Sequence, residues 1–225
     1  MMFSFESFEP SLLSKCRRLI ELMISSPHNL TSVRIFERAV TVHLEDVLIP
    51  FTNAMLMGSC VDIGSGGGIP GLVLAAVFPK SSWLLLDSIG KKTQEIERFA
   101  REMELSNVTV KTARAEEFAL EERASFDSAF LRAVARCDVS MELAAPLVKI
   151  GGSIFLYKGP GWNEERRFAS VAEERLGLRL SQEKEYCLSD GSARFLVVYE
   201  KEVETPREFP RRVGMASKSP LGGSK

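Results

Sequence analysis

The 225-residue sequence contains few of the side chains that build metal centres and disulfide frameworks. It has two histidines and four scattered cysteines, and no two cysteines form a C-x-x-C pair. We therefore expect no bound metal and no disulfide framework, and this cysteine usage fits a reducing cytoplasm. No apolar run approaches the length of a membrane span, and no basic segment precedes an apolar stretch at the N-terminus, so we predict neither a membrane anchor nor a signal peptide.

The sequence also lacks an excess of charge of either sign. There are 29 Lys and Arg residues against 30 Asp and Glu residues, which gives a net charge of −1. Bulk electrostatics thus do not indicate a nucleic-acid partner, although a local basic patch would be enough to bind one. The 45% hydrophobic content is ordinary for a globular chain that buries a sizeable core.

The first fifty residues have helical periodicity. An apolar stripe at three-and-four spacing runs from Leu12 to Met23, and a turn follows at residues 25–29. Thr31 or Ser32 is positioned to cap a second helix that ends near Pro50. We divide the chain into a helical extension (1–50), a main domain (51–200) and a basic, flexible tail (201–225).

From residue 58 onward, short apolar runs alternate with helical stretches. Six runs read as strands, and a seventh strand starts near Lys184 and leads through a Gly-containing turn into the last of them, which predicts an antiparallel hairpin. The alternation predicts an α/β fold with a doubly wound, mostly parallel, seven-stranded sheet. The six runs cover residues 59–63, 83–87, 108–111, 126–131, 153–157 and 195–199.

A glycine-rich loop follows the first of these strands and opens a helix. It reads Asp62-Ile63-Gly64-Ser65-Gly66-Gly67-Gly68-Ile69-Pro70-Gly71, and glycines in such a loop let a ligand approach the backbone closely. The segment matches both the dinucleotide fingerprint G-x-G-x-x-G and the D-x-G-x-G-x-G pattern of S-adenosylmethionine-dependent methyltransferases. An acid before the glycines would repel a pyrophosphate but can receive the ammonium of a methionine moiety, so Asp62, Gly64, Gly66 and Gly68 favour the second class.

The second strand ends in Asp87, whose carboxylate can accept both ribose hydroxyls of either cofactor. Asp87 therefore supports adenosine binding without separating the two classes. The alternative interpretation is that Asp62 and Asp87 only cap helices and that the glycines only form turns.

The chain resembles the bacterial small-subunit ribosomal RNA methyltransferase G family, also called glucose-inhibited division protein B. The resemblance covers nearly the whole chain and is strongest in the glycine loop and in the segment that contains Asp87. The matching segments, in order, are residues 29–34, 43–46, 62–71, 86–92, 114–118, 132–135, 157–159, 209–214, 217–218 and 220–221. The resemblance implies a Rossmann-like class I methyltransferase fold and S-adenosylmethionine as cofactor, with S-adenosylhomocysteine as product. It also implies methylation of N7 of one guanine in 16S ribosomal RNA, guanine 527, to give 7-methylguanosine.

The resemblance assigns roles to further residues. Gly64 and Ile69 match the cofactor loop of the family, and Ala115 and Glu116 match the segment beside the adenine. Arg132 matches an arginine that the family places at both the cofactor and the reaction centre, which makes it the candidate catalytic residue. The sequence departs from the family pattern at Val47 and Leu131, where the family usually has serine.

The chemistry of such a methyl transfer fits the scarcity of histidine. Guanine N7 carries a free lone pair at neutral pH, so the reaction requires alignment and exclusion of water but no general base. Cys137 has no flanking motif of a cysteine nucleophile, and we interpret it as a small buried residue. Two other functions remain open: a nicotinamide-dependent oxidoreductase, favoured only by the overlapping glycine pattern, and an RNA-binding module that has lost catalysis.

Candidate RNA contacts lie in two places. Lys158 ends a strand at the ligand-bearing edge of the predicted sheet, where it could contact a phosphate. The tail from residue 207 carries five basic residues against one acid, and among them we assign Arg211, Arg212 and Lys218 to the RNA backbone. His43, at helical spacing with Leu44, is interpreted either as a half-buried structural histidine or as an RNA contact. The expected partner is 16S ribosomal RNA or a precursor of the small ribosomal subunit, and the expected oligomeric state is a monomer.

Overall fold

One seven-stranded sheet organises the part of the chain that the computed structural model describes, residues 8–51 and 58–223. The strand order is β3-β2-β1-β4-β5-β7-β6, and β7 is antiparallel to both of its neighbours while the other pairs are parallel. The predicted α/β fold, the seven strands and the terminal hairpin are confirmed. The strands are β1 (Ser59–Ile63), β2 (Ser82–Asp87), β3 (Val108–Thr112), β4 (Phe126–Arg132), β5 (Val148–Lys158), β6 (Leu178–Cys187) and β7 (Ala193–Lys201).

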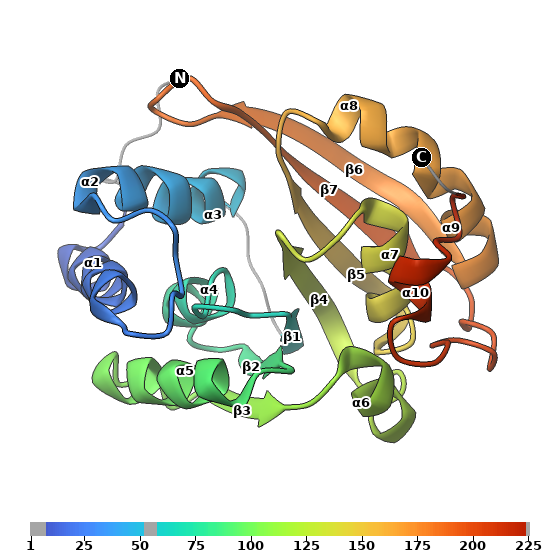
Figure 1. Cartoon of the computed structure of the whole chain (residues 1–225), viewed down its shortest axis with the longest axis horizontal. Helices are drawn as coiled ribbons and strands as arrows, with labels where there is room; N and C mark the ends of the chain where they lie inside the picture. Colours follow the sequence, from blue (N-terminus) through green and yellow to red (C-terminus); the bar gives the residue numbers. More distant parts are fainter. Residues whose placement is uncertain (1–7, 52–57, 224–225) are drawn as a thin grey trace.

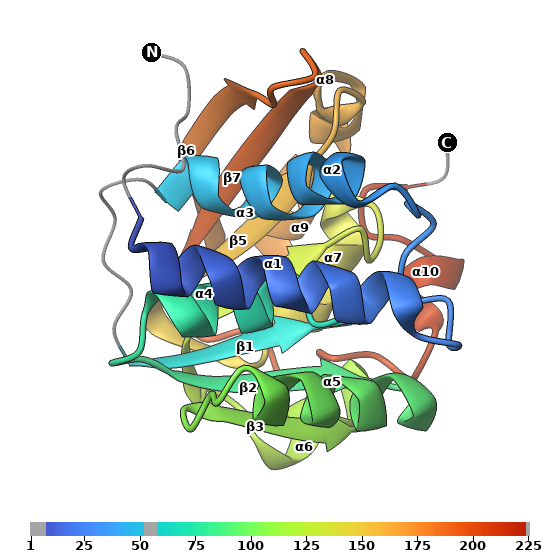
Figure 2. The ribbon, with the colours of Figure 1, turned by 90° about the vertical axis from the view of Figure 1, so that its left-hand side faces the viewer.

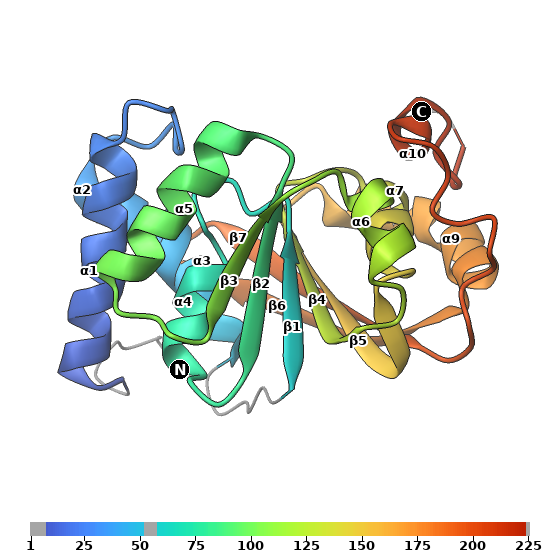
Figure 3. The ribbon, with the colours of Figure 1, turned by 90° about the horizontal axis from the view of Figure 1, so that it is seen from below.

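Helices cover both faces of the sheet (Figure 3). On one face lie α1 (Pro10–Ser25), α2 (Phe36–Ala39), α3 (Asp46–Leu48), α4 (Gly71–Val77) and α5 (Gly90–Glu102). On the other face lie α6 (Ala115–Glu121), α7 (Cys137–Ala144), α8 (Trp162–Glu165) and α9 (Ala169–Leu176), with α10 (Met215–Lys218) outside α7 (Figure 1). Figure 2 shows α1 stretched across the first face between α2 and α5.

The two faces of the sheet bury two separate hydrophobic clusters. Along β1, Cys60 belongs to the cluster under α1 and α4, whereas Val61 and Ile63 belong to the cluster under α6 and α7. The alternation follows from the period of two in a strand. Because both faces are covered, the central strands are mostly apolar, and this makes them recognisable in the sequence.

The helical extension is built partly as predicted. The apolar stripe of α1 is buried, but the second helix begins at Phe36, so the prediction that Thr31 or Ser32 caps it was wrong. Thr31 is buried instead. Its hydroxyl lies 2.9 Å from Nε2 of His43 and accepts a hydrogen bond from the Val33 amide. This helix continues through a π-helical segment, Val40–Glu45, into α3 and a 3₁₀ turn at Ile49–Phe51.

The segment after β7 packs against the main domain. The prediction of a flexible tail does not agree with its described part, residues 202–223, in which Phe209 and Ala216 are buried and Arg123 donates to the carbonyls of Thr205 and Phe209. Lys225, which was included in the charge of the tail, lies outside the described residues. Within the described ranges, no helix has both the length and the apolarity to span a membrane.

Candidate cofactor site

The candidate site lies where the strand order reverses. β1 has β2 on one side and β4 on the other, and the connections leave in opposite directions from this point. In open parallel sheets, ligands bind at such a switch point, beyond the carboxyl ends of the strands. Asp62, Asp87 and Arg132 stand at or next to the carboxyl ends of these three strands, so the fold brings together residues that are far apart in sequence.

The glycine loop is fixed by hydrogen bonds to β2 and its terminal acid. The amide of Gly64 donates to the Leu86 carbonyl at 2.7 Å, and the amide of Gly66 donates to Oδ2 of Asp87 at 2.9 Å. Gly64 has a φ of +71°, and a Cβ there would lie 2.9 Å from Cγ2 of Val134. Only glycine satisfies both the backbone conformation and the space at this position.

Asp62 is almost fully enclosed beneath the loop. Its side chain accepts the Gly71 amide through Oδ2 at 2.9 Å, whereas Oδ1 has no hydrogen-bond partner among the described residues. Burial raises the pKa of this carboxyl to about 7. A buried carboxylate oxygen without a partner is costly in a folded protein. The enclosed Oδ1 is thus an acceptor left without a partner among the described residues, and Asp62 does not line the pocket described next. That Asp62 receives the ammonium of a methionine moiety stays a prediction.

A pocket of about 340 Å³ opens beside this loop. Four of the predicted cofactor residues line it, namely Gly64, Asp87, Ala115 and Glu116, and Ile63 and Leu86 contribute apolar surface. The Asp87 carboxylate is buried, and its Oδ1 accepts the Ile89 amide at 2.9 Å. Asp87 therefore caps local backbone as well as facing the pocket, so the alternative interpretation of its role is part of the geometry.

The other predicted cofactor residues stand behind the pocket wall. Gly66, Gly68 and Ile69 belong to the loop and to its turn into α4, and they do not line the pocket. Their place is to shape the backbone that holds Gly64 and Asp87.

Among the pocket residues that the sequence did not single out, two come from the C-terminal segment. Gly214 and Ser217 line the pocket, and the amide of Gly214 donates to Oε1 of Glu116 at 2.9 Å. The available signal was the match of residues 209–214 to the family. We interpreted this segment only as an RNA-binding tail.

Arg132 is held by the helical extension. Its Nε donates to Oδ2 of Asp46 at 2.8 Å, and one terminal nitrogen donates to the Val42 carbonyl at 2.8 Å. Asp46 is buried and also accepts the hydroxyl of Tyr186 at 2.8 Å. The guanidinium is therefore fixed at the end of β4 by α3 and β6, and it does not line the pocket.

His43 completes this network as a neutral, structural residue. Burial and the neighbouring Arg132 lower the pKa of His43 to about 4, so the ring carries no charge at neutral pH. Its Nδ1 lies 3.5 Å from a terminal nitrogen of Arg132, which can only donate, so Nε2 carries the proton and donates to Thr31. Of the two interpretations of His43, the geometry favours the structural one.

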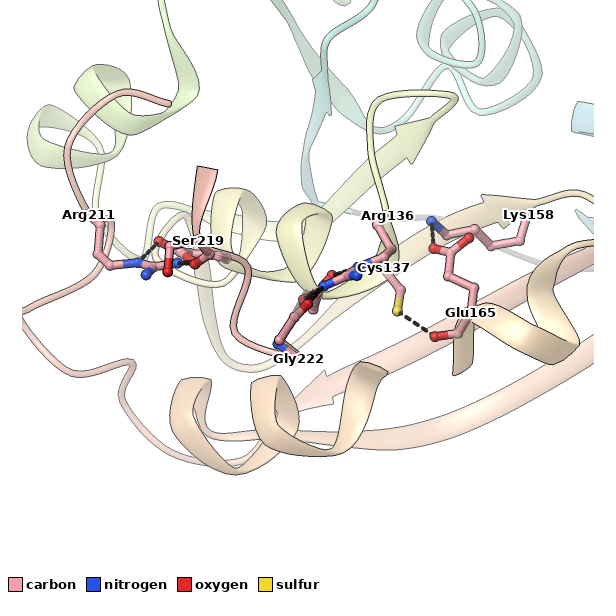
Figure 4. Close-up of polar contacts among 10 residues, drawn as sticks. Arg136, Cys137, Lys158, Glu165, Arg211, Ser219 and Gly222 are labelled. Carbon is pink, nitrogen blue, oxygen red and sulfur yellow. Dashed lines mark hydrogen bonds and ion pairs between the residues drawn. The ribbon is translucent and has the colours of Figure 1, made fainter. Parts of the chain in front are cut away.

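The four candidate RNA residues divide into two pairs. Figure 4 shows Lys158 beside Glu165. Nζ of Lys158 lies 2.6 Å from Oε1 of Glu165, and Arg211 donates to the buried Glu142. These contacts neutralise Lys158 and Arg211 within the fold and do not support their assignment to RNA. The side chains of Arg212 and Lys218 are exposed and make no ion pair within the described residues.

The positions that depart from the family pattern face the interior. Val47 and Leu131 are buried in the two hydrophobic clusters, so neither side chain lines the pocket. Cys137 is fully buried, its pKa is raised to about 12 by burial, and its thiol faces the Glu165 carbonyl. The interpretation of Cys137 as a small buried residue is confirmed. No group of three or more potential metal ligands gathers anywhere in residues 8–51 or 58–223.

Comparisons with known proteins agree with this geometry. A family model described as rRNA small subunit methyltransferase G matches residues 13–186. The chain is 42% identical over 214 residues to the ribosomal RNA small subunit methyltransferase G of Thermotoga neapolitana, covering 95% of this chain and 93% of the relative. It is 41% identical over 209 residues to the protein of the same name from Fervidobacterium nodosum, covering 91% and 96% respectively.

A solved structure, M. jannaschii TYW2 in complex with AdoMet, superposes on the chain with a TM-score of 0.54 at 14% identity. The match covers 71% of this chain and 76% of that one, and at this identity it supports the fold alone. The sheet order and flanking helices are those of the Rossmann-like class I methyltransferase fold.

Proposed function

Because the chain belongs to the ribosomal RNA small subunit methyltransferase G family, we propose that it transfers a methyl group from S-adenosylmethionine to N7 of one guanine in 16S ribosomal RNA, guanine 527 in the family. The observation that carries the proposal is the pocket at the switch point, where Asp87 and Glu116 offer carboxylates beside the Gly64 backbone. Oδ1 of Asp62 lies beneath the same loop without a hydrogen-bond partner in the part of the chain that the structure describes, and this supports the proposal.

The residues present fit S-adenosylmethionine better than a dinucleotide. Asp87 can accept the ribose hydroxyls, and Ala115 and Glu116 offer a backbone amide and a carboxylate to an adenine edge. The carboxyl of Asp62 suits the ammonium of the methionine moiety, whereas a pyrophosphate at this loop would meet unfavourable negative charge. The nicotinamide alternative is therefore disfavoured by charge.

The cofactor supplies an electrophilic methyl group on a sulfonium. Held by Asp87 and Glu116, it would offer that methyl to the N7 lone pair, its sulfur would keep the electron pair of the broken methyl–sulfur bond, and the base would take the positive charge. No proton is removed, which agrees with a site whose single histidine, His43, is neutral and engaged with Thr31. The chain thus acts through alignment: Asp87 and Glu116 orient the donor, and Asp46 holds Arg132, the candidate catalytic residue, at the carboxyl end of β4.

RNA recognition requires basic side chains that the fold has not already neutralised. Lys92 and Arg114 line the cofactor pocket, and Arg212 and Lys218 lie on the neighbouring C-terminal segment. None of the four makes an ion pair within the described residues, so they are the proposed phosphate contacts near the mouth of the pocket. We place the protein in the cytoplasm as a monomer that acts on the small ribosomal subunit or its precursor.

Methyl transfer from labelled S-adenosylmethionine tests the proposal. The substrates are naked 16S ribosomal RNA and small subunits, both taken from a strain that lacks this modification, and the modified base is mapped by cleavage specific for 7-methylguanosine. We expect label at one guanine as 7-methylguanosine, and loss of transfer in Asp87→Ala but not in the control Asp190→Ala, because Asp190 is exposed in the β6–β7 turn.

The other outcomes distinguish the alternatives. Label on another base or atom contradicts the proposed specificity. Binding of S-adenosylhomocysteine without transfer to either substrate points to a non-catalytic RNA-binding module. Binding of NADH in place of S-adenosylhomocysteine points to an oxidoreductase.

A further inference from the structure

The C-terminal segment, residues 202–223, lies along the outer side of α7, close to α6 and the cofactor pocket (Figures 1 and 3). It reaches the pocket at Gly214 and Ser217. Both residues follow β7, the last strand of the sheet, and neither belongs to a helix that connects two strands. Their position therefore depends on the contacts that anchor the segment.

The anchors are two carboxylates on α7. Asp138 and Glu142 are four residues apart, which places them on the same side of the helix, and both are almost completely buried. Glu142 receives two hydrogen bonds from the Arg211 guanidinium, at 2.7 and 2.5 Å. Figure 4 shows Arg211 next to Ser219, whose carbonyl accepts a third hydrogen bond from Arg211.

The second anchor holds the far end of the segment. Asp138 accepts the amide of Gly222 at 2.8 Å and hydrogen bonds from Nε and Nη2 of Arg136. Nη2 of Arg136 also donates to the Gly223 carbonyl. The stretch between the two anchors contains α10 and the two pocket-lining residues. Held at residue 211 and again at residue 222, it has little freedom to leave the pocket.

At the pocket, the segment fixes one of the proposed cofactor ligands. The Gly214 amide donates to Oε1 of Glu116 at 2.9 Å, with Gly214 in the left-handed conformation that begins α10 at a φ of +78°. The other carboxylate oxygen of Glu116 carries no hydrogen bond within the described residues and is available to a ligand. Gly214 thus orients the Glu116 carboxylate.

We propose that residues 211–222 form the outer wall of the cofactor pocket, with Ser217 facing the adenosyl group and the Arg211–Glu142 ion pair acting as the positioning element. The inference rests on the proposed function, because it takes the adenosyl group of S-adenosylmethionine as the ligand. It assigns the C-terminal segment first to cofactor binding, with Arg212 and Lys218 left to face RNA.

Two neighbouring arginines provide a matched test. Arg211→Gln breaks the ion pair with Glu142, and Arg212→Gln removes the same charge from an exposed side chain. Affinity for S-adenosylhomocysteine is measured by calorimetry on both variants and on the wild type, after circular dichroism has established that each is folded. We expect Arg211→Gln to weaken binding at least about tenfold and Arg212→Gln to stay within about twofold of the wild type.

A second pair of variants tests the wall without disturbing the buried ion pair. Ser217→Trp places a large ring at the pocket, and Ser219→Trp places it two residues away at an exposed position that does not line the pocket. We expect at least about tenfold weaker S-adenosylhomocysteine binding for Ser217→Trp and little change for Ser219→Trp. This comparison stands even if Arg211→Gln does not fold, since a merely structural role would not separate the two tryptophan variants.

The outcomes separate the inference from the proposed function. If the wild type binds S-adenosylhomocysteine and Ser217→Trp binds it equally well, the outer wall is wrong while the proposed function stands. If the variants lose binding but the wild type methylates no ribosomal RNA, the proposed function fails and the wall stands. A wild type that does not bind S-adenosylhomocysteine overturns both.

Discussion

Replacing Asp62 with asparagine is expected to stabilise the free protein at alkaline pH and to weaken cofactor binding. The carboxyl is enclosed, one of its oxygens has no partner within the described residues, and burial raises its pKa from 3.8 to about 7. The folded protein therefore retains the proton of Asp62 up to about pH 7, whereas the unfolded chain releases it near pH 4. A carboxyl with a raised pKa in the folded state lowers stability as pH rises between these values.

The magnitude follows from the two pKa values. Ionising Asp62 in the folded protein costs roughly 4 kcal/mol more than in the unfolded chain, at 1.36 kcal/mol for each pH unit between them. At pH 5, where the folded carboxyl is still protonated, less than half of this destabilisation is present. Asparagine carries no such charge, although its amide donor at the position of Oδ1 lacks an acceptor and costs about 1–3 kcal/mol at any pH.

The assay is urea unfolding of wild type and Asp62→Asn at pH 5 and pH 8, with linear extrapolation to water. The unfavourable amide cancels in the comparison between the two pH values, so the substitution is expected to be roughly 3 kcal/mol more favourable at pH 8 than at pH 5. Asp127→Asn is the matched control. Its hydrogen bond with Lys149 lowers the pKa of Asp127 to about 2, so its effect on stability is the same at both pH values.

An effect of Asp62→Asn that does not change between pH 5 and pH 8 refutes the raised pKa and the reasoning built on it. Affinity for S-adenosylhomocysteine in the same variant tests the second half of the prediction. Wild-type affinity in Asp62→Asn excludes a contact between Asp62 and the ammonium. A gain in stability together with a loss of binding identifies a residue that is retained for ligand binding at the expense of stability.

Three further predictions concern the pocket and the thiols. Gly64→Val places a side chain on a left-handed backbone and against Val134. We expect calorimetry to detect no S-adenosylhomocysteine binding, while the far-ultraviolet circular dichroism spectrum stays native. Binding with wild-type affinity excludes a cofactor contact at Gly64. Asp87→Ala removes the acceptor for the Gly66 and Ile89 amides and for the ribose, and a loss of about 1.5–3 kcal/mol, roughly 10- to 150-fold in affinity, is expected from the same measurement; an unchanged affinity contradicts the ribose assignment. Of the four cysteines, Cys187 is exposed, whereas Cys16, Cys60 and Cys137 are buried with pKa values raised to about 12. A colorimetric thiol reagent is therefore expected to label one thiol quickly in the native protein and four after unfolding. Fast labelling of two or more thiols in the native state contradicts the burial.

The sheet could be predicted from the sequence because its central strands carry a local signal. A continuous apolar run that ends in an acid, as in β2, can be recognised without knowledge of the neighbouring strands. The glycine loop and Asp87 were recognisable for the same reason, since the chemistry is contained within about thirty residues.

Features that depend on distant partners were not predictable in this way. The predicted start of the second helix was wrong because the Thr31 hydroxyl forms a hydrogen bond with the His43 ring and does not cap a helix. No local pattern in the sequence distinguishes these two roles. Arg211 was assigned to RNA because its charge, seen alone, indicates an anion, whereas its partner Glu142 lies on a helix 69 residues away and is hidden from solvent. Pairs of this kind are set by tertiary packing, which composition and spacing do not encode.

The contacts that join distant parts of the chain around the candidate site also bear on how the protein folds. Gly214 and Glu116 are 98 residues apart, Arg132 and Asp46 are 86 residues apart, and Gly222 and Asp138 are 84 residues apart. Closing loops of this length costs entropy before the contact is made, and chains rich in such distant contacts fold slowly. The pocket cannot assemble from any single local stretch of the chain, so the recovery of cofactor binding during refolding reports the formation of the complete native topology rather than of any one element.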